Sequence, residues 1–344
     1  MKQLPSIIST DPLGNIPESV EVAEHEEGAD PIEPSERRPF VIDQAHHGQR
    51  LDRALAARVP EFSRSYLQQL IEAGAVELQG RTLTKASAAV KAGQSGHIEL
   101  RPTPQSQAFR PEAMDIVTVY EDEHLRIVDK PAGLVVHPAP GHWSGTLLNG
   151  LLALDPKAVL LPRAGIVHRL DRDTSGLMVV ARTRAAMDAM VALIAAREVK
   201  RQYLAIGHRQ WEGAAARHVD APIGRDPRNR LRMAVVDLER NAGKTARTLI
   251  ERLDSNAEGC AVRCTLETGR THQIRVHMAS IGHPLVGDSL YGGAPAAGLS
   301  RQALHAFRLA FVHPVTQEAL EFRSPLPADL IQALQSWGLD YNRA

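Results

Sequence analysis

Segment 168–176 and the apolar run that follows it constrain this chain more than any other feature. The segment reads His-Arg-Leu-Asp-Arg-Asp-Thr-Ser-Gly, and the run 177–181 (Leu-Met-Val-Val-Ala) is typical of a buried strand. A carboxylate held among arginines at a strand entrance, as Asp171 is, can stay ionised and keep one direction. The same residues also fit a plain surface turn, in which Asp171 closes an Asx-turn and Arg169 pairs with it in solvent.

Four blocks of the sequence, in order, resemble the RNA pseudouridine synthases of the RluA family. Segment 168–176 resembles the family signature, and 128–138 resembles its Lys-Pro-x-Gly turn. Block 199–205 resembles the Lys-x-Tyr-x-Ala strand, and 266–278 resembles the third block, which 283–288 (His-Pro-Leu-Val-Gly-Asp) follows. The stretches 145–149, 162–168 and 301–305 most resemble members that modify large-subunit ribosomal RNA.

Composition describes an ordinary globular chain with enough length for two domains. It has 344 residues, of which 43% are hydrophobic and 23% charged. No apolar run is long enough for a membrane span, and no secretory pattern is present, so we expect a cytoplasmic protein without a membrane partner. The two cysteines, Cys260 and Cys264, lack a second pair, which predicts no zinc site and fits a reducing compartment.

The formal net charge of zero hides an asymmetry along the chain. Residues 1–39 hold nine acidic and three basic side chains, whereas the remainder holds 37 basic and 31 acidic ones. The body is therefore mildly basic, which fits a nucleic-acid ligand. The first 39 residues, rich in Pro, Glu, Ser and Asp, are predicted to form a disordered acidic tail.

Composition and hydrophobic patterns divide the rest of the chain into a compact unit over 40–101, a linker over 102–112 and a larger unit over 113–335. Resemblance to known proteins implies that the first is an RNA-binding domain and the last the catalytic domain. The catalytic part alternates strand-like runs with helical patterns, which predicts an α+β class with a largely antiparallel mixed sheet and flanking helices. The family resemblance implies the pseudouridine synthase fold. The expected strands are 116–120, 125–128, 134–137, 177–182, 202–207, 248–252 and 260–266, and the expected helices are 146–154, 184–196 and 271–281.

The small domain resembles the RNA-binding domain first known from ribosomal protein S-four. The resemblance is carried by Arg50-Leu51-Asp52, Ser63-Arg64, Gly74-Ala75-Val76 and Gly80. Ser63 is also a candidate N-cap of a second helix. The resemblance makes Arg50, Arg53 and Arg64 candidate contacts to RNA phosphates, and the alternative is that they are solvated charges on helix faces.

Turning uridine into pseudouridine breaks a nitrogen–carbon glycosidic bond and remakes it as a carbon–carbon bond on the same ring. The product is an isomer formed without redox change, so we expect no cofactor and no metal. The reaction needs one carboxylate, and the resemblance gives that role to Asp171. The residues leave open whether this group attacks the sugar, attacks the ring or takes a proton.

The resemblance implies roles for five further side chains. Arg275 matches the arginine that pairs with the catalytic aspartate, through two parallel hydrogen bonds. Tyr203 matches the tyrosine that stacks on the extruded uracil; stacking is worth about 1–3 kcal/mol, comparable to the few kcal/mol that extrusion costs. Arg169 matches the residue that fills the gap left by the base, although a phosphate contact explains it equally well. Lys130 and Arg270 are further candidate RNA contacts.

The function implied by the resemblance is isomerisation of specific uridines in large-subunit (23S) ribosomal RNA. The partner would be this RNA or a pre-ribosomal particle, and the enzyme would be a monomer. One alternative is the same chemistry on other rRNA or tRNA uridines, and another is a noncatalytic RNA-binding assembly factor. A glycosidase using Asp171 and Asp173 would release uracil, but carboxylates two residues apart in a turn have no assured separation.

Overall fold

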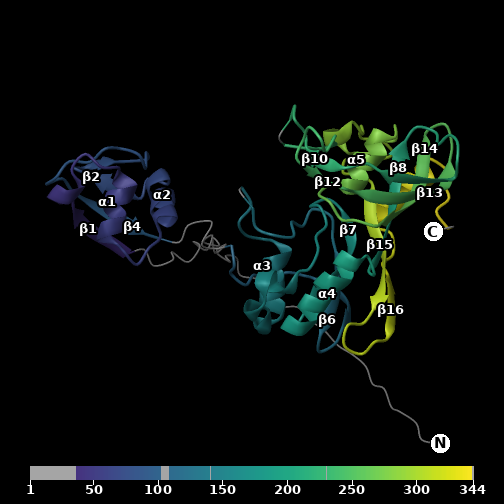
Figure 1. Ribbon diagram of the computed structural model, residues 1–344, viewed down its shortest axis with the longest axis horizontal. Helices are drawn as coiled ribbons and strands as arrows, with labels where there is room; N and C mark the ends of the chain where they lie inside the picture. The colour runs from purple at the N-terminus through teal and green to yellow at the C-terminus, as the bar shows by residue number, and fades with distance from the viewer. Residues whose placement is uncertain (1–35, 102–107, 140, 230, 343–344) are drawn as a thin grey trace, which may run out of the picture. The chain divides into compact units, whose positions relative to one another are not determined.

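The computed structural model describes residues 36–101, 108–139, 141–229 and 231–342, which belong to two compact units (Figure 1). The first unit falls within residues 1–102 and the second within 103–344. No helix among the described residues is long and apolar enough to cross a membrane. Most of the predicted acidic tail, residues 1–35, lies outside the described residues. Residues 36–39 form the start of a strand, so for them the prediction of disorder is wrong.

The first unit is an antiparallel sheet of order β1-β4-β2-β3 with two helices packed on it. Ser63 caps the second helix as predicted, because its hydroxyl accepts a hydrogen bond from the Tyr66 amide at 3.2 Å. Leu51 and Leu67 are fully buried against the sheet. Its elements are β1 (Glu36–Val41), η1 (Gln44–His46), α1 (Leu51–Arg58), α2 (Arg64–Glu72), β2 (Val76–Leu78), β3 (Arg81–Thr82) and β4 (Ser95–Leu100).

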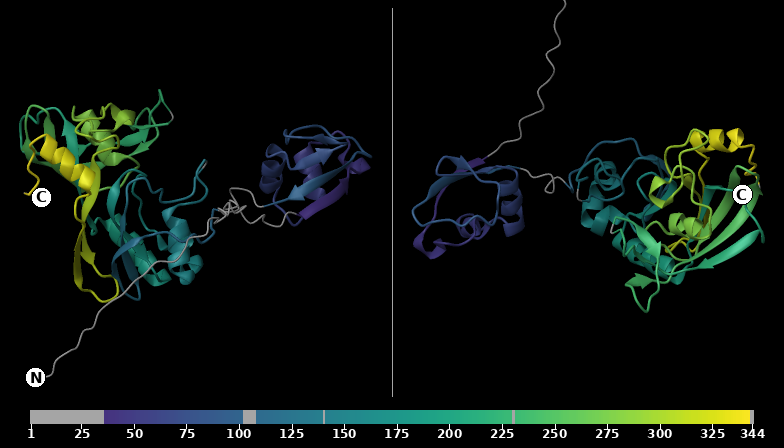
Figure 2. Two further views of the ribbon diagram at one scale, coloured as in Figure 1. Left: turned by 180° about the vertical axis from the view of Figure 1, so that it is seen from behind. Right: turned by 90° about the horizontal axis from the view of Figure 1, so that it is seen from above.

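The second unit is built on a nine-stranded sheet, with strand order β5-β6-β7-β15-β8-β14-β13-β9 and β16 paired to β15. Figure 2 shows this unit from two further sides. Only the β7–β15 pair is parallel, so the sheet is mixed and largely antiparallel, as predicted. The main strands are β5 (Val117–Glu121), β6 (Leu125–Lys130), β7 (Ser175–Ala181), β8 (Lys200–His208), β9 (Ala216–Asp220), β13 (Arg247–Ser255), β14 (Gly259–Leu266), β15 (Leu304–Val312) and β16 (Ala319–Arg323).

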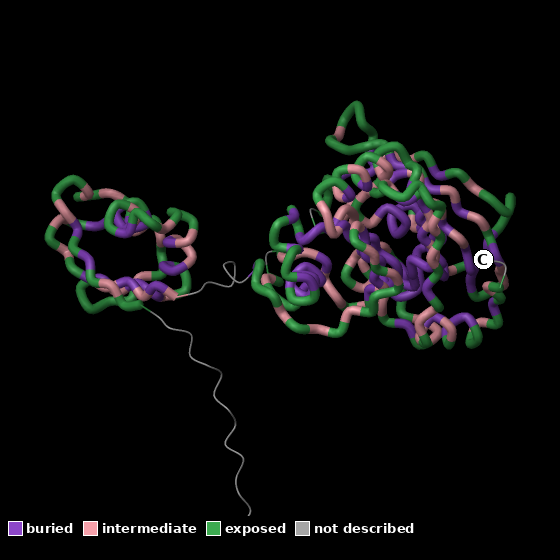
Figure 3. The backbone as a smooth tube through the Cα atoms, turned by 90° about the horizontal axis from the view of Figure 1, so that it is seen from below, coloured by how far each residue is buried: buried purple, intermediate pink, exposed green. Residues whose placement is uncertain are grey.

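Helices cover both faces of this sheet, and alternate residues of each strand therefore enter different cores. Met178 of β7 and Tyr203 of β8 share one core with α3 (Leu147–Leu154) and α5 (Gln273–Ser280). Val179 packs on the other face with α4 (Arg184–Ala196), and Leu204 packs there with α6 (Ala328–Ser336). The tube in Figure 3 shows buried residues concentrated inside this unit.

The remaining short elements of the second unit lie outside the main sheet. A small antiparallel sheet has the order β11-β10-β12. Its strands are β10 (Ile223–Arg225), β11 (Met233–Val235) and β12 (Gly243–Lys244), and the 3-10 helices are η2 (Pro156–Leu160), η3 (Pro162–Gly165) and η4 (Ser289–Tyr291).

The predicted linker 102–112 is only partly a connection between units. Residues 102–107 lie outside the described residues, but 108–112 pack on the start of α3. Asn149 Nδ2 donates to the carbonyls of Ala108 and Arg110, and Ala108 is buried. Residues 108–112 therefore belong to the second unit.

The predicted strand at 134–137 is wrong, because other groups bind the backbone carbonyls there. The Leu134 carbonyl accepts from Lys130 Nζ at 3.0 Å. The Val135 and Val136 carbonyls accept from the first two amides of α3 at 2.8 and 3.2 Å. The stretch therefore forms a loop that closes the N-terminus of the helix. The other expected strands and helices of the catalytic domain are confirmed.

Candidate active site

A cavity of about 780 Å³ opens on the face of the sheet that α3 and α5 cover. Its wall includes Leu148 of α3, Ile274 of α5 and Tyr203 of β8. This volume lies in the range of pockets that hold drug-sized ligands, about 300–1,000 Å³, and so suits one nucleotide. Basic side chains outnumber acidic ones in the wall: Arg163, Arg169, Arg197, Arg201, Arg270 and Arg275 against Asp171 and Glu267.

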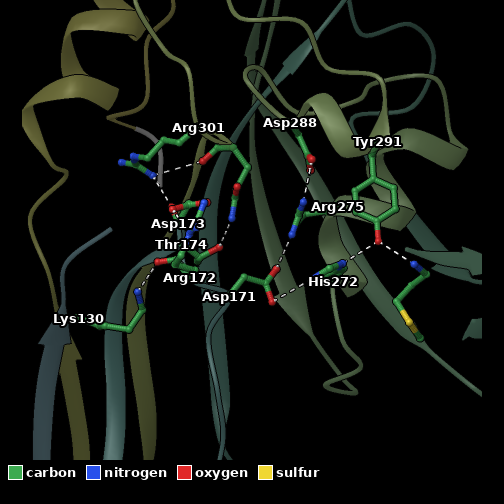
Figure 4. A network of polar contacts seen from close by, with 12 residues as sticks. Lys130, Asp171, Arg172, Asp173, Thr174, His272, Arg275, Asp288, Tyr291 and Arg301 are labelled. Carbon is green, nitrogen blue, oxygen red and sulfur yellow. Dashed lines mark hydrogen bonds and ion pairs between the residues drawn. The ribbon is translucent and has the colours of Figure 1, made fainter. Parts of the chain in front are cut away.

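Asp171 reaches the cavity from a turn whose backbone carbonyls accept hydrogen bonds from a buried lysine and a partly buried arginine. The Thr174 amide closes the turn on the Asp171 carbonyl at 3.1 Å. Lys130 Nζ donates to the Arg172 carbonyl at 2.8 Å, and Arg301 Nη1 donates to the next carbonyl at 3.0 Å (Figure 4). The turn leads directly into β7, so the sheet fixes the direction of the Asp171 side chain.

Arg275 is the partner of Asp171, as the sequence predicted. Its Nη1 donates to Asp171 Oδ2 at 3.1 Å, and the two residues are 104 positions apart in the chain. Arg275 lies in the first turn of α5, and its side chain is 8% exposed. The pairing differs from the prediction in one respect: only one hydrogen bond, not two, joins the guanidinium to this carboxylate.

The two-point contact of Arg275 is made with Asp288 instead. Nε and Nη2 of Arg275 donate to the two Asp288 oxygens at 2.7 and 2.9 Å, and Asp288 is 2% exposed. The Arg275 guanidinium also lies 5.0 Å from the centre of the Tyr291 ring. Burial alone would lower the pKa of Arg275, but the hydrogen bonds and charge of Asp288, with the charge of Asp171, raise it above its ordinary value. Asp288 therefore fixes a permanently charged group beside Asp171.

His272 completes the polar network around Asp171. Its Nε2 lies 3.8 Å from Asp171 Oδ1, and its Nδ1 is hydrogen-bonded to the Tyr291 hydroxyl at 2.7 Å (Figure 4). Burial lowers the pKa of His272, although the charge of Asp171 opposes the shift. The imidazole is therefore mainly neutral at pH 7, and Arg275 is the cation that faces the Asp171 carboxylate.

Tyr203 shares the cavity wall with Asp171 and is 5% exposed. Burial raises the pKa of Tyr203 to about 12, with the charge of Arg201 opposing the shift and that of Asp171 adding to it. The phenol is thus uncharged at physiological pH. Its predicted role as a stacking surface stays a prediction, and its position in the cavity is compatible with it.

Two of the predicted RNA contacts, Arg169 and Arg270, also line the cavity. Arg169 is exposed at its wall, and Arg270 is partly buried, with its Nε donating to the Thr245 carbonyl at 3.0 Å. Both roles stay predictions.

The prediction of an RNA contact at Lys130 is wrong, because this lysine is 1% exposed. Its Nζ donates to the carbonyls of Pro131, Leu134 and Arg172 at 2.7, 3.0 and 2.8 Å. Three acceptors match the three hydrogens of an ammonium group. Lys130 therefore holds two turns together inside the protein.

In the first unit, two of the three predicted phosphate contacts bind a buried carboxylate. Arg50 and Arg64 each donate two hydrogen bonds to Asp52, which is fully buried. The Arg50 hydrogen bonds are the main cause that holds the pKa of Asp52 far below its usual range. Both guanidinium groups stay about half exposed, and Arg53 is exposed. Their predicted contacts with phosphate remain predictions.

The sequence predicted no role in the site for Asp288, Tyr291, His272 or Arg201. Asp288 is the last residue of the block 283–288, and its position in a motif block could have marked it as a site residue. Arg201 lies in the block 199–205, two residues before Tyr203, and side chains two apart on a strand share a face. Tyr291 lies outside the motif blocks, so nothing in the sequence indicated that the fold brings it to the site.

Comparisons with known proteins show which families the chain resembles. Residues 124–280 match the family described as RNA pseudouridylate synthase, and residues 49–95 match the S4 domain. A Xanthomonas campestris protein named ribosomal large subunit pseudouridine synthase D is 44% identical over 334 residues, covering 93% of this chain and 98% of that protein. The Escherichia coli K12 protein of the same name is 41% identical, covering 88% of this chain and 94% of that protein.

Solved structures agree at the level of the fold. Human RNA pseudouridylate synthase domain containing 1 has a TM-score of 0.50 and 26% identity, covering 66% of this chain and 86% of that one. Human RNA pseudouridylate synthase domain containing 4 has a TM-score of 0.51 and 23% identity, covering 65% and 94%. On these grounds the chain belongs to the RNA pseudouridine synthases of the RluA family, with an S4 domain preceding the synthase domain.

Proposed function

We propose that this protein converts uridines of large-subunit (23S) ribosomal RNA to pseudouridine, with Asp171 acting on a uridine extruded from the RNA. One observation carries the proposal: in a basic cavity of nucleotide size, the Asp171 carboxylate accepts a hydrogen bond from a buried arginine at 3.1 Å. A family relationship alone would support an RNA substrate. This geometry adds a charged, oriented carboxylate that a nucleotide in the cavity would meet.

The second carboxylate of the cavity wall suits the reaction less well than Asp171. Glu267 directly follows β14, and its Oε1 lies 3.7 Å from His218 Nδ1. Asp173, the other acid of the signature, is absent from the described cavity wall. Its carboxylate pairs with the neighbouring Arg172 at 3.0 Å (Figure 4). Glycosidases that hydrolyse with two acids need both at a set distance across the bond, and Asp171 and Asp173 do not supply that arrangement.

The chemistry requires the N1–C1′ bond of uridine to break and a C5–C1′ bond to form. C5 then loses its proton, and N1 gains one, so atoms and electrons balance within the nucleotide. Arg275 places a buried positive charge beside the Asp171 carboxylate and fixes the direction of one of its oxygens, whichever of the sugar, the ring or a proton that carboxylate engages. Tyr203, an uncharged aromatic side chain, would stack on the base and offset about 1–3 kcal/mol of the extrusion cost.

The choice of large-subunit RNA rests on the names of the relatives. Those that cover most of this chain carry the name ribosomal large subunit pseudouridine synthase D. The S4 domain match supports an additional RNA contact outside the catalytic domain. We infer that the protein acts as a monomer on this RNA or on a precursor particle that contains it.

The test uses the purified full-length protein with an unmodified 23S transcript and with large-subunit particles that lack pseudouridine. Nucleoside analysis by mass spectrometry and chemical mapping should show pseudouridine at defined positions, with an equal loss of uridine and no free uracil.

Three other results would overturn the proposal in different ways. Released uracil would indicate a hydrolase. Modification of tRNA but of neither large-subunit substrate would change the substrate. Tight RNA binding with no pseudouridine in any substrate would indicate an assembly factor.

A further inference from the structure

Arg201 is a buried arginine in the wall of the catalytic cavity. It lies on β8 two residues before Tyr203, so both side chains leave the strand on the same face. Both line the cavity that contains Asp171. The whole residue is 6% exposed. A positive charge is therefore held beside the place where the base and its carboxylate partner would meet.

Within the described residues, Arg201 differs from the other buried arginines in having no ionic partner. Arg126 and Arg275 are the other buried arginines, and each pairs with carboxylates at 3.1 Å or less. No carboxylate lies within 4 Å of Arg201 in the part of the chain that the structure describes, and its buried Nε has no hydrogen-bond partner there. A buried charge without a partner costs several kcal/mol, so such groups are normally paired.

The surrounding backbone leaves room for this guanidinium. Gly269 lies in the loop between β14 and α5, and a Cβ built there would come within 2.8 Å of Arg201 Nη1. The charge of Arg201 also acts on His168, which lines the same cavity: burial, with the positive charge of Arg201 adding to it, lowers the pKa of His168 to about 3. The cavity thus holds Arg201 with its charge neither neutralised nor exposed to bulk solvent.

We propose that Arg201 binds a phosphate group of the RNA backbone next to the target uridine. The proposal rests on the function proposed above, since it takes RNA as the ligand of this cavity. A guanidinium binds a phosphate through parallel charged hydrogen bonds, which satisfies both its charge and its donors. The phosphate would complete the site when RNA enters, and would fix the nucleotide relative to Tyr203 and Asp171.

The phosphate can be tested by making it neutral. The probe is a synthetic RNA hairpin around a uridine that the wild-type enzyme modifies, with one flanking phosphate at a time replaced by a methylphosphonate. Binding is measured by fluorescence anisotropy in an Asp171→Asn background, so that the RNA is not consumed. Because one charged contact is lost, we expect one neutral linkage to weaken binding about 10- to 100-fold when Arg201 is present.

The second arm of the test is the Arg201→Gln variant. It should bind the normal hairpin about 10- to 100-fold more weakly and lose little further affinity with the neutral linkage, because both changes remove the same contact. Arg201→Lys keeps the positive charge but not the planar guanidinium that makes parallel hydrogen bonds. Its affinity for the normal hairpin should lie between those of the parent and Arg201→Gln. Arg126→Gln is the matched control, because it removes a buried arginine that is paired with Glu121. With this variant the neutral linkage should weaken RNA binding as much as it does with the parent.

Two results would overturn the proposal. The first is additive losses from Arg201→Gln and every flanking methylphosphonate. The second is that the affinity lost in Arg201→Gln overlaps with the affinity lost when thiouridine replaces the target uridine, and with that of no neutral phosphate linkage. Arg201 would then bind a uracil carbonyl. Thermal unfolding of Arg201→Gln without RNA distinguishes RNA binding from a merely structural role. A structural role predicts a lower Tm with unchanged RNA affinity. Our account predicts that the free variant is at least as stable as the parent, because an unpaired buried charge is gone. Wild-type pseudouridine formation is measured separately and tests the proposed function alone.

Discussion

At the scale of single residues, the site depends on a chain of three charged side chains. Asp288 holds Arg275 at two points, and Arg275 holds Asp171 at one. The outer carboxylate is almost completely buried, whereas the side chain of Asp171 is 16% exposed at the cavity. The arrangement leaves one acceptor oxygen of Asp171 outside the contact with Arg275 while fixing the side chain's direction.

Replacing Asp288 by Asn should therefore impair both stability and turnover. Arg275 would keep Asp171 as its only ionic partner, and we expect a loss of about 3 kcal/mol in unfolding free energy, the lower end for a broken buried pair. Misplacement of Arg275 should also slow pseudouridine formation about 10²-fold. Urea unfolding and single-turnover rates measure the two effects.

Asp226→Asn provides the matched control for that variant. Asp226 is 5% exposed and pairs with Arg232 at 2.6 Å, outside the described cavity wall. Its loss should cost stability and leave turnover per folded molecule unchanged. If Asp288→Asn behaves in the same way, Asp288 has no part in aiming the catalytic pair.

His168 makes the stability of this region depend on pH. Its Nε2 accepts a hydrogen bond from the Val179 amide at 3.1 Å, and burial lowers its pKa to about 3. In the unfolded chain the group protonates near pH 6.5, so the unfolded state binds more protons between pH 6.5 and 3. Stability therefore rises with pH through this window and is flat above it.

We expect wild type to lose on the order of 1–2 kcal/mol more than His168→Gln when the pH falls from 7.5 to 5. Glutamine offers an acceptor oxygen but does not titrate. Urea unfolding of both proteins at the two pH values measures the difference. Equal losses would show that His168 is not held in its neutral form.

At the scale of secondary-structure elements, β7 connects the site to the sheet. It pairs antiparallel with β6 and parallel with β15, and all its residues are buried. Gly176 follows the turn that carries Asp171 by a few residues and pairs with Ala306 of β15 in the parallel ladder. The close approach of the two backbones at this point fixes where the turn leaves the sheet.

Gly176→Ala should be strongly destabilising for two reasons that can be separated. The residue has a φ of +113°, and an added Cβ would lie 2.3 Å from the Ala306 carbonyl oxygen. Gly133 also has a positive φ, +89°, but a Cβ there meets nothing within 4 Å. We expect Gly133→Ala to cost about 1–2 kcal/mol from backbone conformation alone and Gly176→Ala to cost clearly more. Urea unfolding measures both losses of unfolding free energy. Equal losses would show that β15 shifts to accept the added Cβ at no cost.

The sequence predicted the elements that carry their own local signals. Continuous apolar runs and helical periodicity located β7, β8, β14 and the three helices around the cavity. It missed β15 and β16, although β15 lies at the centre of the sheet. The run 304–312 is interrupted by His305 and Arg308, whose partners, Ser175 and Gln202, come from distant strands. Such polar residues are explained only by long-range pairing, which a single sequence does not reveal.

The same limit applied to the site. Asp171, Arg275 and Tyr203 were found through motif blocks, and the fold brings all three to one cavity. Asp288 and Arg201 stand in those blocks too, but burial and ion pairing decide what they do. Lys130 was misread for this reason, because a lysine in a motif beside a turn has no sign of burial in its sequence.

At the scale of the whole molecule, the chain forms two folded units, and we propose RNA contacts for both. Each has its own hydrophobic core. The cavity that contains Asp171 lies entirely in the second unit. The first unit matches the S4 domain and carries arginines that are exposed or half exposed. This division predicts that affinity and chemistry can be changed separately.

Removing residues 1–107 should weaken binding to long RNA and flatten its dependence on salt. Each phosphate contact that is lost reduces the slope of log K against log salt by about 0.7–0.9. The rate at saturating RNA should stay near that of the full chain, since the cavity is intact. Filter binding across a salt series gives the slope. An unchanged slope would remove the first unit as a source of phosphate contacts.

The most direct measurement compares pseudouridine formation by Asp171→Asn and Asp173→Asn. The two acids share one turn, but only Asp171 lines the cavity and meets Arg275. Our account predicts no detectable pseudouridine in 23S RNA with Asp171→Asn, RNA binding retained, and activity of Asp173→Asn close to wild type. Pseudouridine formed by Asp171→Asn at the wild-type rate would contradict the assignment of this carboxylate as the group that acts on uridine.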